Sequence, residues 1–229
     1  MKYSCIIPIY NEESRIGNVL EQIVQIKKIS EIICIDDGST DNSSKLVKEK
    51  YPQVKIIRHE RNLGKTAAIL TGLKYVKSES VLLLDSDLIN LKFEEIDNAF
   101  SYFEKNRLDC LLFNTAPMNY IDRLLRRLFR FLLLVAGSRI INKQCLIEAL
   151  NSKTLGSYQL EIAQNKYLME NNKNVAYIDI SAKDVSKIDK IGFLRGWQDE
   201  LKMWRQIITY AGLLFFIKQS LFFCKNKVF

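Results

Sequence analysis

Three consecutive residues in the first half of the chain carry side chains suited to metal chemistry. Asp85, Ser86 and Asp87 follow the four-residue apolar run Val81–Leu84. Two carboxylates at the end of a buried strand offer hard oxygen donors of the kind that Mg²⁺ and Mn²⁺ prefer. A cation bound there neutralises the charge that develops on a departing diphosphate. The alternative interpretation is that Asp-Ser-Asp only caps the helix that follows.

Two further turns carry polar groups suited to a nucleotide. One is Asp36-Asp37-Gly38-Ser39-Thr40-Asp41, and the other is Asn62-Leu63-Gly64-Lys65. A fixed carboxylate can accept the imide N–H of a uracil or thymine ring, while backbone N–H groups and the Lys65 ammonium can hold a diphosphate. The alternatives are an ordinary strand-to-helix turn with Ser39 or Asp41 as the helix cap, and a solvated loop lysine.

Short apolar runs are expected to form the strands that position these turns. They are Cys5–Ile9, Ile32–Ile35, Val54–Ile57 and Val81–Leu84, and the segments Glu13–Ile26 and Thr66–Val76 between them have apolar residues near helical spacing. This alternation predicts an α/β fold, Rossmann-like, with a mostly parallel sheet flanked by helices. Ligands bind at the carboxyl edge of such sheets. The chain has neither a P-loop nor a G-x-G-x-x-G motif, which disfavours a Walker-type ATPase and a dinucleotide dehydrogenase.

Composition places the chain among ordinary folded proteins. Its 229 residues, 48% of them hydrophobic and 26% charged, suffice for a single domain over residues 1–229. Five scattered cysteines without a C-x-x-C pair, and no signal-peptide-like run, indicate a reduced, cytoplasmic compartment. The formal charge of +8 indicates an anionic partner. Because no nucleic-acid-binding motif is visible, we expect that partner not to be a nucleic acid.

Four ordered blocks in the first 90 residues resemble the family 2 glycosyltransferases, which have the GT-A fold. The blocks are Ile7–Glu13, Ile35–Asp41, Arg61–Lys65 and Leu84–Asp87. The resemblance implies that residues 1–90 bind a nucleoside diphosphate sugar, foremost a UDP-sugar, with Mg²⁺ or Mn²⁺ as cofactor. It implies that Asp37 contacts the base, that Lys65 lies near base or phosphate, and that Asp87 is the principal metal ligand. The implied donor-binding residues are Pro8, Tyr10, Asn11, Glu12, Asp37, Gly38, Asn62, Gly64, Lys65, Asp85 and Ser86.

Residues 91–200 are expected to form the acceptor half. Gly137-Ser138-Arg139 and Gly156–Glu161 resemble the acceptor side of the branch that contains glucosyl-3-phosphoglycerate synthases and polyprenyl-phosphate sugar transferases. This resemblance implies a phosphorylated or polyprenyl-phosphate acceptor and places Glu161 in the active site. In the expected mechanism Asp85 supports the metal on Asp87, and Lys65 and Arg139 add positive charge that helps to neutralise the departing diphosphate. A solvated helix face is the alternative reading of Glu161.

The two remaining candidate positions concern metal binding and the single histidine. In similar proteins a histidine three residues before a lysine completes the metal site, but this chain has Asp184 in that place, before Lys187. Asp184 is itself a competent oxygen ligand, so Asp87, Asp85 and Asp184 form the expected metal set. The departure leaves the third ligand open. His59 is expected to be a loop or partly buried residue and not a catalyst.

Two apolar and basic segments indicate a membrane surface. Arg123, Arg126, Arg127 and Arg130 recur at helical spacing among leucines and phenylalanines, and residues 201–229 combine the apolar run Ile207–Ile217 with a basic tail. Such helices lie in the interface of an anionic bilayer, so we expect peripheral attachment to the inner face of the membrane. Lys218 interrupts the second run before the roughly 20 residues that a span needs. Core packing and a homodimer contact are the alternatives.

The sequence therefore predicts a metal-dependent glycosyltransferase that acts at a membrane surface. Two other functions stay open. A sugar-1-phosphate nucleotidyltransferase shares the Rossmann-like half but needs a glycine-rich, arginine-bearing loop near the N-terminus, and this chain has none. A catalytically weak nucleotide-sugar-binding or membrane-associated scaffold protein keeps the donor residues and loses acceptor chemistry, as the departure at Asp184 allows.

Overall fold

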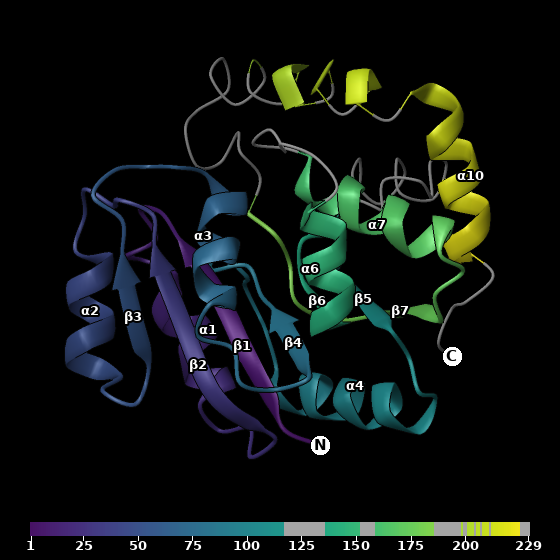
Figure 1. The fold of residues 1–229 in the computed structure, drawn as a ribbon. Coiled ribbons are helices and arrows are strands. Elements are labelled where there is room, and N and C mark those ends of the chain that lie inside the picture. Colours follow the sequence, from purple (N-terminus) through teal and green to yellow (C-terminus); the bar gives the residue numbers. More distant parts are fainter. Residues whose placement is uncertain are drawn as a thin grey trace.

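The computed structural model describes residues 1–116, 136–151, 159–185 and most of 198–224, the gaps there being 199–200, 204, 207 and 211. In these ranges the centre of the fold is a seven-stranded mixed sheet with the order β3-β2-β1-β4-β6-β5-β7 (Figure 1). Four of the pairings are parallel, and β6 runs antiparallel to both of its neighbours, β4 and β5.

The elements alternate along the chain as the sequence predicts. The strands are β1 (Tyr3–Ile9), β2 (Ile29–Asp36), β3 (Lys55–Arg58), β4 (Ser80–Leu83), β5 (Cys110–Asn114), β6 (Arg139–Asn142) and β7 (Val175–Asp179). The helices are α1 (Ile16–Ile23), α2 (Ser43–Lys50), α3 (Lys65–Leu73), α4 (Phe93–Lys105), α6 (Lys143–Asn151), α7 (Leu160–Glu170) and α10 (Leu213–Cys224). The predicted α/β class with a mostly parallel sheet is confirmed.

Helices cover both faces of the sheet because successive side chains of a strand point to opposite sides. In β1, Cys5 and Ile7 face a core that they share with α1, α2 and α4, whereas Ile6 faces the core formed by α3, α6 and α7. Figure 1 shows α3, α6 and α7 together on one side of the sheet. The strands are therefore buried on both faces, which explains their nearly continuous apolar sequences.

The predicted strands are all present, and the helix ends differ by a few residues. Helix α1 begins at Ile16 and not at Glu13, because the backbone N–H of Glu13 donates to Asp41 Oδ2 at 3.1 Å and so belongs to a loop network. Helix α3 begins at Lys65, one residue earlier than expected.

The expected membrane-facing segments are described only in part. The basic helix predicted around Arg123–Leu132 lies outside the described residues. Helix α10 packs against α7 and β7 and leaves Leu214 and Leu221 exposed. In the ranges that the structure covers, none of the helices combines the length and the apolar character that crossing a bilayer demands.

Candidate active site

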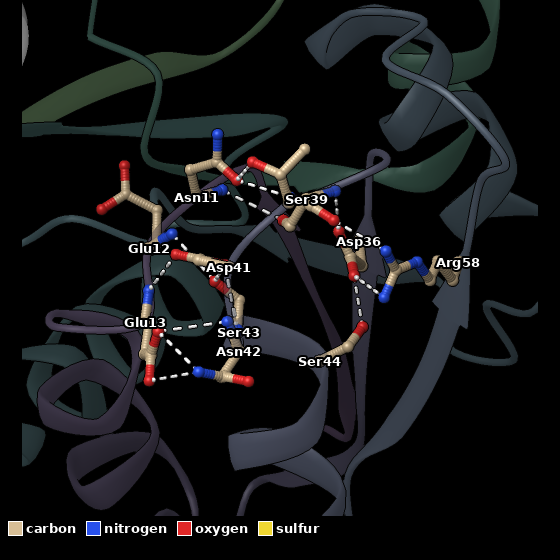
Figure 2. Close-up of polar contacts among 11 residues, drawn as sticks. Asn11, Glu12, Glu13, Asp36, Ser39, Asp41, Asn42, Ser43, Ser44 and Arg58 are labelled. Carbon is tan, nitrogen blue, oxygen red and sulfur yellow. Dashed lines mark hydrogen bonds and ion pairs between the residues drawn. The ribbon is translucent and has the colours of Figure 1, made fainter.

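The loops after β1 and β2 are joined by side-chain to backbone hydrogen bonds (Figure 2). The N–H of Asn11 donates to Ser39 Oγ at 3.0 Å, and Asn11 Oδ1 accepts the N–H of Thr40 at 2.8 Å. Asn11 adopts a left-handed φ of 55°, which asparagine tolerates better than most residues. The N–H of Glu12 donates to Ser43 Oγ at 2.9 Å. The two predicted donor-binding loops therefore form one rigid unit.

The adjacent aspartates at the end of β2 have different surroundings. Asp36 is fully buried, and its carboxylate accepts the N–H of Ser39 at 2.8 Å and the hydroxyl of Ser44. Arg58 lies 3.6 Å away on the neighbouring strand. Asp36 thus holds the turn from β2 to α2, whereas the side chain of Asp37 turns toward the loop before α3.

Asp37 fastens the loop that leads to Lys65. Its Oδ1 accepts the N–H of Leu63 at 2.9 Å, and its Oδ2 accepts the N–H of Gly64 at 2.7 Å. Gly38 allows this approach because a Cβ atom there would lie 2.6 Å from the carbonyl carbon of Arg61, and because its φ is +76°. The conformation and the contact both require glycine.

Lys65 joins the donor half to the acceptor half. Its Nζ lies 2.7 Å from Asp85 Oδ1, after β4, and 2.8 Å from Glu161 Oε1, in the first turn of α7. Burial acts to lower the pKa of Lys65, but the two carboxylates outweigh burial and raise this pKa far above its ordinary range. The ammonium is therefore charged at neutral pH and is attracted to both carboxylates.

The segment before β6 closes over the Lys65–Asp85 ion pair. Ser138 Oγ accepts the N–H of Asp85 at 3.1 Å and lies 3.0 Å from Asp85 Oδ2, to which it donates. A Cβ atom on Gly137 would lie 2.4 Å from Lys65 Nζ and 2.5 Å from Asp85 Oδ2. Glycine at this position lets the backbone lie directly against the ion pair.

Asp87 and Asp184, two of the three expected metal ligands, lie on neighbouring segments. An antiparallel bridge between Ile89 and Lys183 has hydrogen bonds of 2.9 and 2.8 Å and brings these segments side by side. Asp184 accepts a hydrogen bond from the Thr115 hydroxyl. Among the described residues, no three Asp, Glu, His or Cys side chains gather as a complete metal cage. One or two of these carboxylates suffice for a cation that takes its remaining ligands from a bound diphosphate and water.

Arg139 is buried below this edge. Its guanidinium donates to Asn165 Oδ1 at 2.9 Å and to the carbonyl of Ala136 at 2.5 Å, and the residue has no exposed surface. These contacts tie the segment that carries Gly137 and Ser138 to α7, which carries Glu161. The predicted direct role of Arg139 in charge neutralisation stays a prediction.

The other expected donor-binding residues line the same carboxyl edge. Tyr10 is 46% exposed directly after β1, whereas Pro8 lies in that strand opposite Ile35. Asn62 is exposed and accepts the N–H of Gly64 at 3.1 Å, and Ser86 is buried. Glu12 forms a 2.5 Å ion pair with Arg15. Among the expected acceptor-side residues, Gly156 to Tyr158 lie outside the described residues.

The sequence interpretation missed the contact between His59 and Asp37, whose Nδ1 and Oδ1 atoms are 2.7 Å apart. No local sequence pattern indicates this contact, because it follows from the register of two strands. Asp36 pairs with Arg58 in the β2–β3 register, so the next residues of the two parallel strands, Asp37 and His59, are neighbours.

The sequence profile described as "Glycosyl transferase family 2" matches residues 4–163, more than half of the chain. Its matched range contains Lys65, Asp85 and Glu161. The fold and this match together define the class: the chain belongs to glycosyl transferase family 2.

Relatives of known name lie among enzymes of polyprenyl-phosphate sugars. The chain is 31% identical over 165 residues to the undecaprenyl-phosphate 4-deoxy-4-formamido-L-arabinose transferase of Salmonella choleraesuis. The aligned region covers 69% of this chain and 46% of that protein. The chain is 32% identical over 120 residues to the dodecaprenyl-phosphate galacturonate synthase of Rhizobium johnstonii, covering 49% and 35%. The chain thus spans less than half the length of these relatives.

Solved structures show the same fold. Glucosyl-3-phosphoglycerate synthase from Mycobacterium tuberculosis, in complex with Mn²⁺, UDP and glucosyl-3-phosphoglycerate, matches with a TM-score of 0.70 at 19% identity, over 93% of this chain and 78% of that one. S. aureus TarS 1-349 in complex with UDP-GlcNAc matches with a TM-score of 0.61 at 19% identity, over 91% and 67%. The GT-A-like architecture expected from the sequence is confirmed.

Proposed function

We propose that this chain transfers a sugar from a nucleoside diphosphate sugar, foremost a UDP-sugar, to a phosphate-bearing or polyprenyl-phosphate acceptor, with Mg²⁺ or Mn²⁺ as cofactor. The observation that carries the proposal is the contact of Lys65 with both Asp85 and Glu161. It joins the donor-side edge to the acceptor-side helix at one point. The named relatives act on polyprenyl phosphates, and a structural neighbour binds UDP with Mn²⁺.

The donor end of the site is supported by the network of loops after β1, β2 and β3. The Asp37 carboxylate offers an acceptor for a uracil imide N–H. Tyr10, directly after β1, and Leu63, in the loop after β3, are 46% and 53% exposed. Covering them with a nucleoside would remove apolar surface from water. Lys65, at the N-terminal end of α3, supplies positive charge for the diphosphate.

We infer that Asp87 holds the cation, as the resemblance to the family implies, with Asp184 and Asp85 as further candidate oxygen donors. When bound, the cation stabilises the negative charge that develops on the departing diphosphate. Lys65 contributes positive charge to the same oxygens. Since Asp85 is already paired with Lys65, its carboxylate also holds the ammonium in place.

Transfer requires an acceptor oxygen to attack the anomeric carbon of the sugar. The bond from that carbon to the β-phosphate oxygen breaks, and the nucleoside diphosphate leaves with the electron pair. A phosphate acceptor is already a nucleophile and needs no strong base. A hydroxyl acceptor gives its proton to Glu161, which lies at the start of α7 and is held by Lys65.

Exposed apolar side chains near the C-terminal end support an acceptor at a membrane surface. Leu214 and Leu221 of α10 are 73% and 63% exposed and lie seven residues apart, on one face of the helix, with exposed Lys218 between them in sequence. An interfacial helix has this combination of apolar and basic groups. Sedimentation with anionic liposomes tests this part: Leu214→Ser/Leu221→Ser should reduce binding, and a wild-type chain that ignores such liposomes would contradict it.

The proposed reaction is tested by incubating the protein with UDP-sugars, Mn²⁺ and a short-chain polyprenyl phosphate or a phosphorylated hydroxy acid, and measuring UDP release and glycosylated product. We expect acceptor-dependent UDP release that disappears in Asp87→Asn. Asp97→Asn, on α4, is the matched control and should retain it. Nucleotide binding without any transfer to either class of acceptor would favour the non-catalytic scaffold.

A further inference from the structure

His59 connects the carboxylate of Asp37 to helix α3. Its Nδ1 lies 2.7 Å from Asp37 Oδ1, and its Nε2 lies 2.9 Å from Thr71 Oγ1. The side chain is only 10% exposed, and the backbone N–H of His59 donates to the carbonyl of Asp36 at 2.8 Å. Both nitrogens of the ring are therefore held, and so is the backbone that carries it.

The hydrogen-bonding partners of His59 determine which of its two ring nitrogens carries a proton. A carboxylate only accepts hydrogen bonds, so Nδ1 carries a proton and donates it to Asp37. In the neutral ring Nε2 is then an acceptor, and the Thr71 hydroxyl donates to it. Asp37 thus selects the tautomer, and the Thr71 hydroxyl, which can donate to Nε2, supports it.

The hydrogen bonds of Asp37 leave one acceptor position for a ligand. A carboxylate has about four lone-pair positions. Oδ1 accepts from His59 and from the N–H of Leu63, and Oδ2 accepts from the N–H of Gly64. Within the described parts of the chain, one position on Oδ2 has no donor. Because the other three are filled, the direction of this fourth position is set by the protein.

We propose that His59, supported by Thr71, is a positioning residue that aims Asp37 at the base and so determines the preference for uracil over cytosine. This inference rests on the proposed function. Uracil presents an N–H at position 3 of the ring, whereas cytosine presents a bare acceptor nitrogen there. A correctly aimed carboxylate attracts the first and repels the second, while a carboxylate that rotates freely distinguishes them less well.

Three substitutions separate the two hydrogen bonds of His59. His59→Leu removes both. His59→Asn keeps a donor close to the position of Nδ1 and loses the contact with Thr71. Thr71→Val keeps the imidazole and removes only the hydroxyl behind it. Glu60→Gln is the matched control, because Glu60 is exposed, adjacent in sequence, and has no contact with His59 among those that the structure describes.

The experiment is a calorimetric titration of each variant with UDP and with CDP in the presence of Mn²⁺. We expect His59→Leu to lower the preference for UDP over CDP by about tenfold, the equivalent of one lost hydrogen bond to a charged group. His59→Asn should restore most of the preference, Thr71→Val should lower it by about threefold, and Glu60→Gln should leave it unchanged.

The outcomes distinguish this inference from the proposed function. If the wild-type chain binds neither nucleotide, the proposed function fails and the inference fails with it. If the wild type prefers UDP and that preference is the same in His59→Leu and Thr71→Val, only the role of His59 is overturned. Should His59→Leu not fold, as thermal unfolding would reveal, the ratios for Thr71→Val and His59→Asn decide the question.

Discussion

Lys65 Nζ lies 2.8 Å from Glu161 Oε1, although the two residues are 96 positions apart in the chain. Lys65 opens α3, on the donor side, and Glu161 lies in the first turn of α7, on the acceptor side. An ion pair between these helices places the group expected to bind the leaving diphosphate next to the group expected to receive the acceptor. The site therefore depends on both halves of the fold.

Replacing Glu161 by glutamine should separate donor binding from transfer. The amide keeps the shape of the side chain but cannot take a proton, so transfer to a hydroxyl acceptor should fall by about a hundredfold. Binding of UDP should stay close to that of the wild type. Glu49→Gln, an exposed glutamate on α2, provides the control and should affect neither quantity. If Glu161→Gln transfers the sugar to a hydroxyl acceptor at the wild-type rate, Glu161 is not the base.

Gly137→Ala should damage activity more than stability. The new methyl group would lie 2.4 Å from Lys65 Nζ and 2.5 Å from Asp85 Oδ2, so the ion pair must separate. Both are ends of side chains that can move, and we expect the melting temperature to change little while transfer falls at least about tenfold. Calorimetric melting measures the change in melting temperature, and a transfer assay measures the loss of activity. A fully active Gly137→Ala variant would show that the pair is not needed.

Gly38→Ala, by contrast, should destabilise the fold. Its φ of +76° and the 2.6 Å approach to the Arg61 backbone leave no room for a Cβ, so we expect a loss of about 1–3 kcal/mol in the free energy of unfolding. Urea denaturation measures this. Gly17→Ala in α1 is the control, because its Cβ would be 3.7 Å from the Tyr51 hydroxyl and alanine favours a helix. Equal stability of the two variants would contradict the account of the turn.

Asp41 should make the protein more sensitive to acid. Partial burial acts to raise its pKa, but hydrogen bonds from the side chain and backbone of Ser43 and from the backbone of Glu13 outweigh burial and lower it below 3.8. A carboxyl with a lowered pKa stabilises the folded state above the unfolded pKa, and this contribution is lost as the pH falls through the folded pKa. Asp41→Asn should be less stable at pH 7, and the difference should shrink below about pH 4. A constant difference over that range would disprove the linkage.

The parts of the fold that depend on local pattern could be predicted from the sequence. The strands that precede Asp37 and Asp85, β2 and β4, were predicted because strands buried on both faces have continuous apolar runs. The first residue of α1 could not be predicted in this way, because it depends on a hydrogen bond from the backbone N–H of Glu13 to Asp41, which lies in another loop. A local pattern carries no information about such long-range contacts.

In the candidate site, too, local features could be predicted from the sequence and long-range contacts could not. The residues of the carboxyl edge were predicted from their position after each strand, and Glu161 from resemblance. The contact of Glu161 with Lys65, the approach of Gly137 and the link from His59 to Asp37 require knowing which strands and helices are neighbours. Asp184 was expected beside the metal, and the bridge between Ile89 and Lys183 now gives a physical reason to keep that prediction.

The central claim is that the carboxyl edge binds a nucleoside diphosphate together with a divalent cation held by Asp87. The most direct measurement is a calorimetric titration of UDP, GDP and dTDP into the protein, with and without Mn²⁺ or Mg²⁺, for the wild type and for Asp87→Ala. We predict that UDP binds best, that the cation strengthens its binding by at least about tenfold, and that Asp87→Ala loses this increase. UDP binding that is equally strong without the cation, or unchanged in Asp87→Ala, would contradict the account.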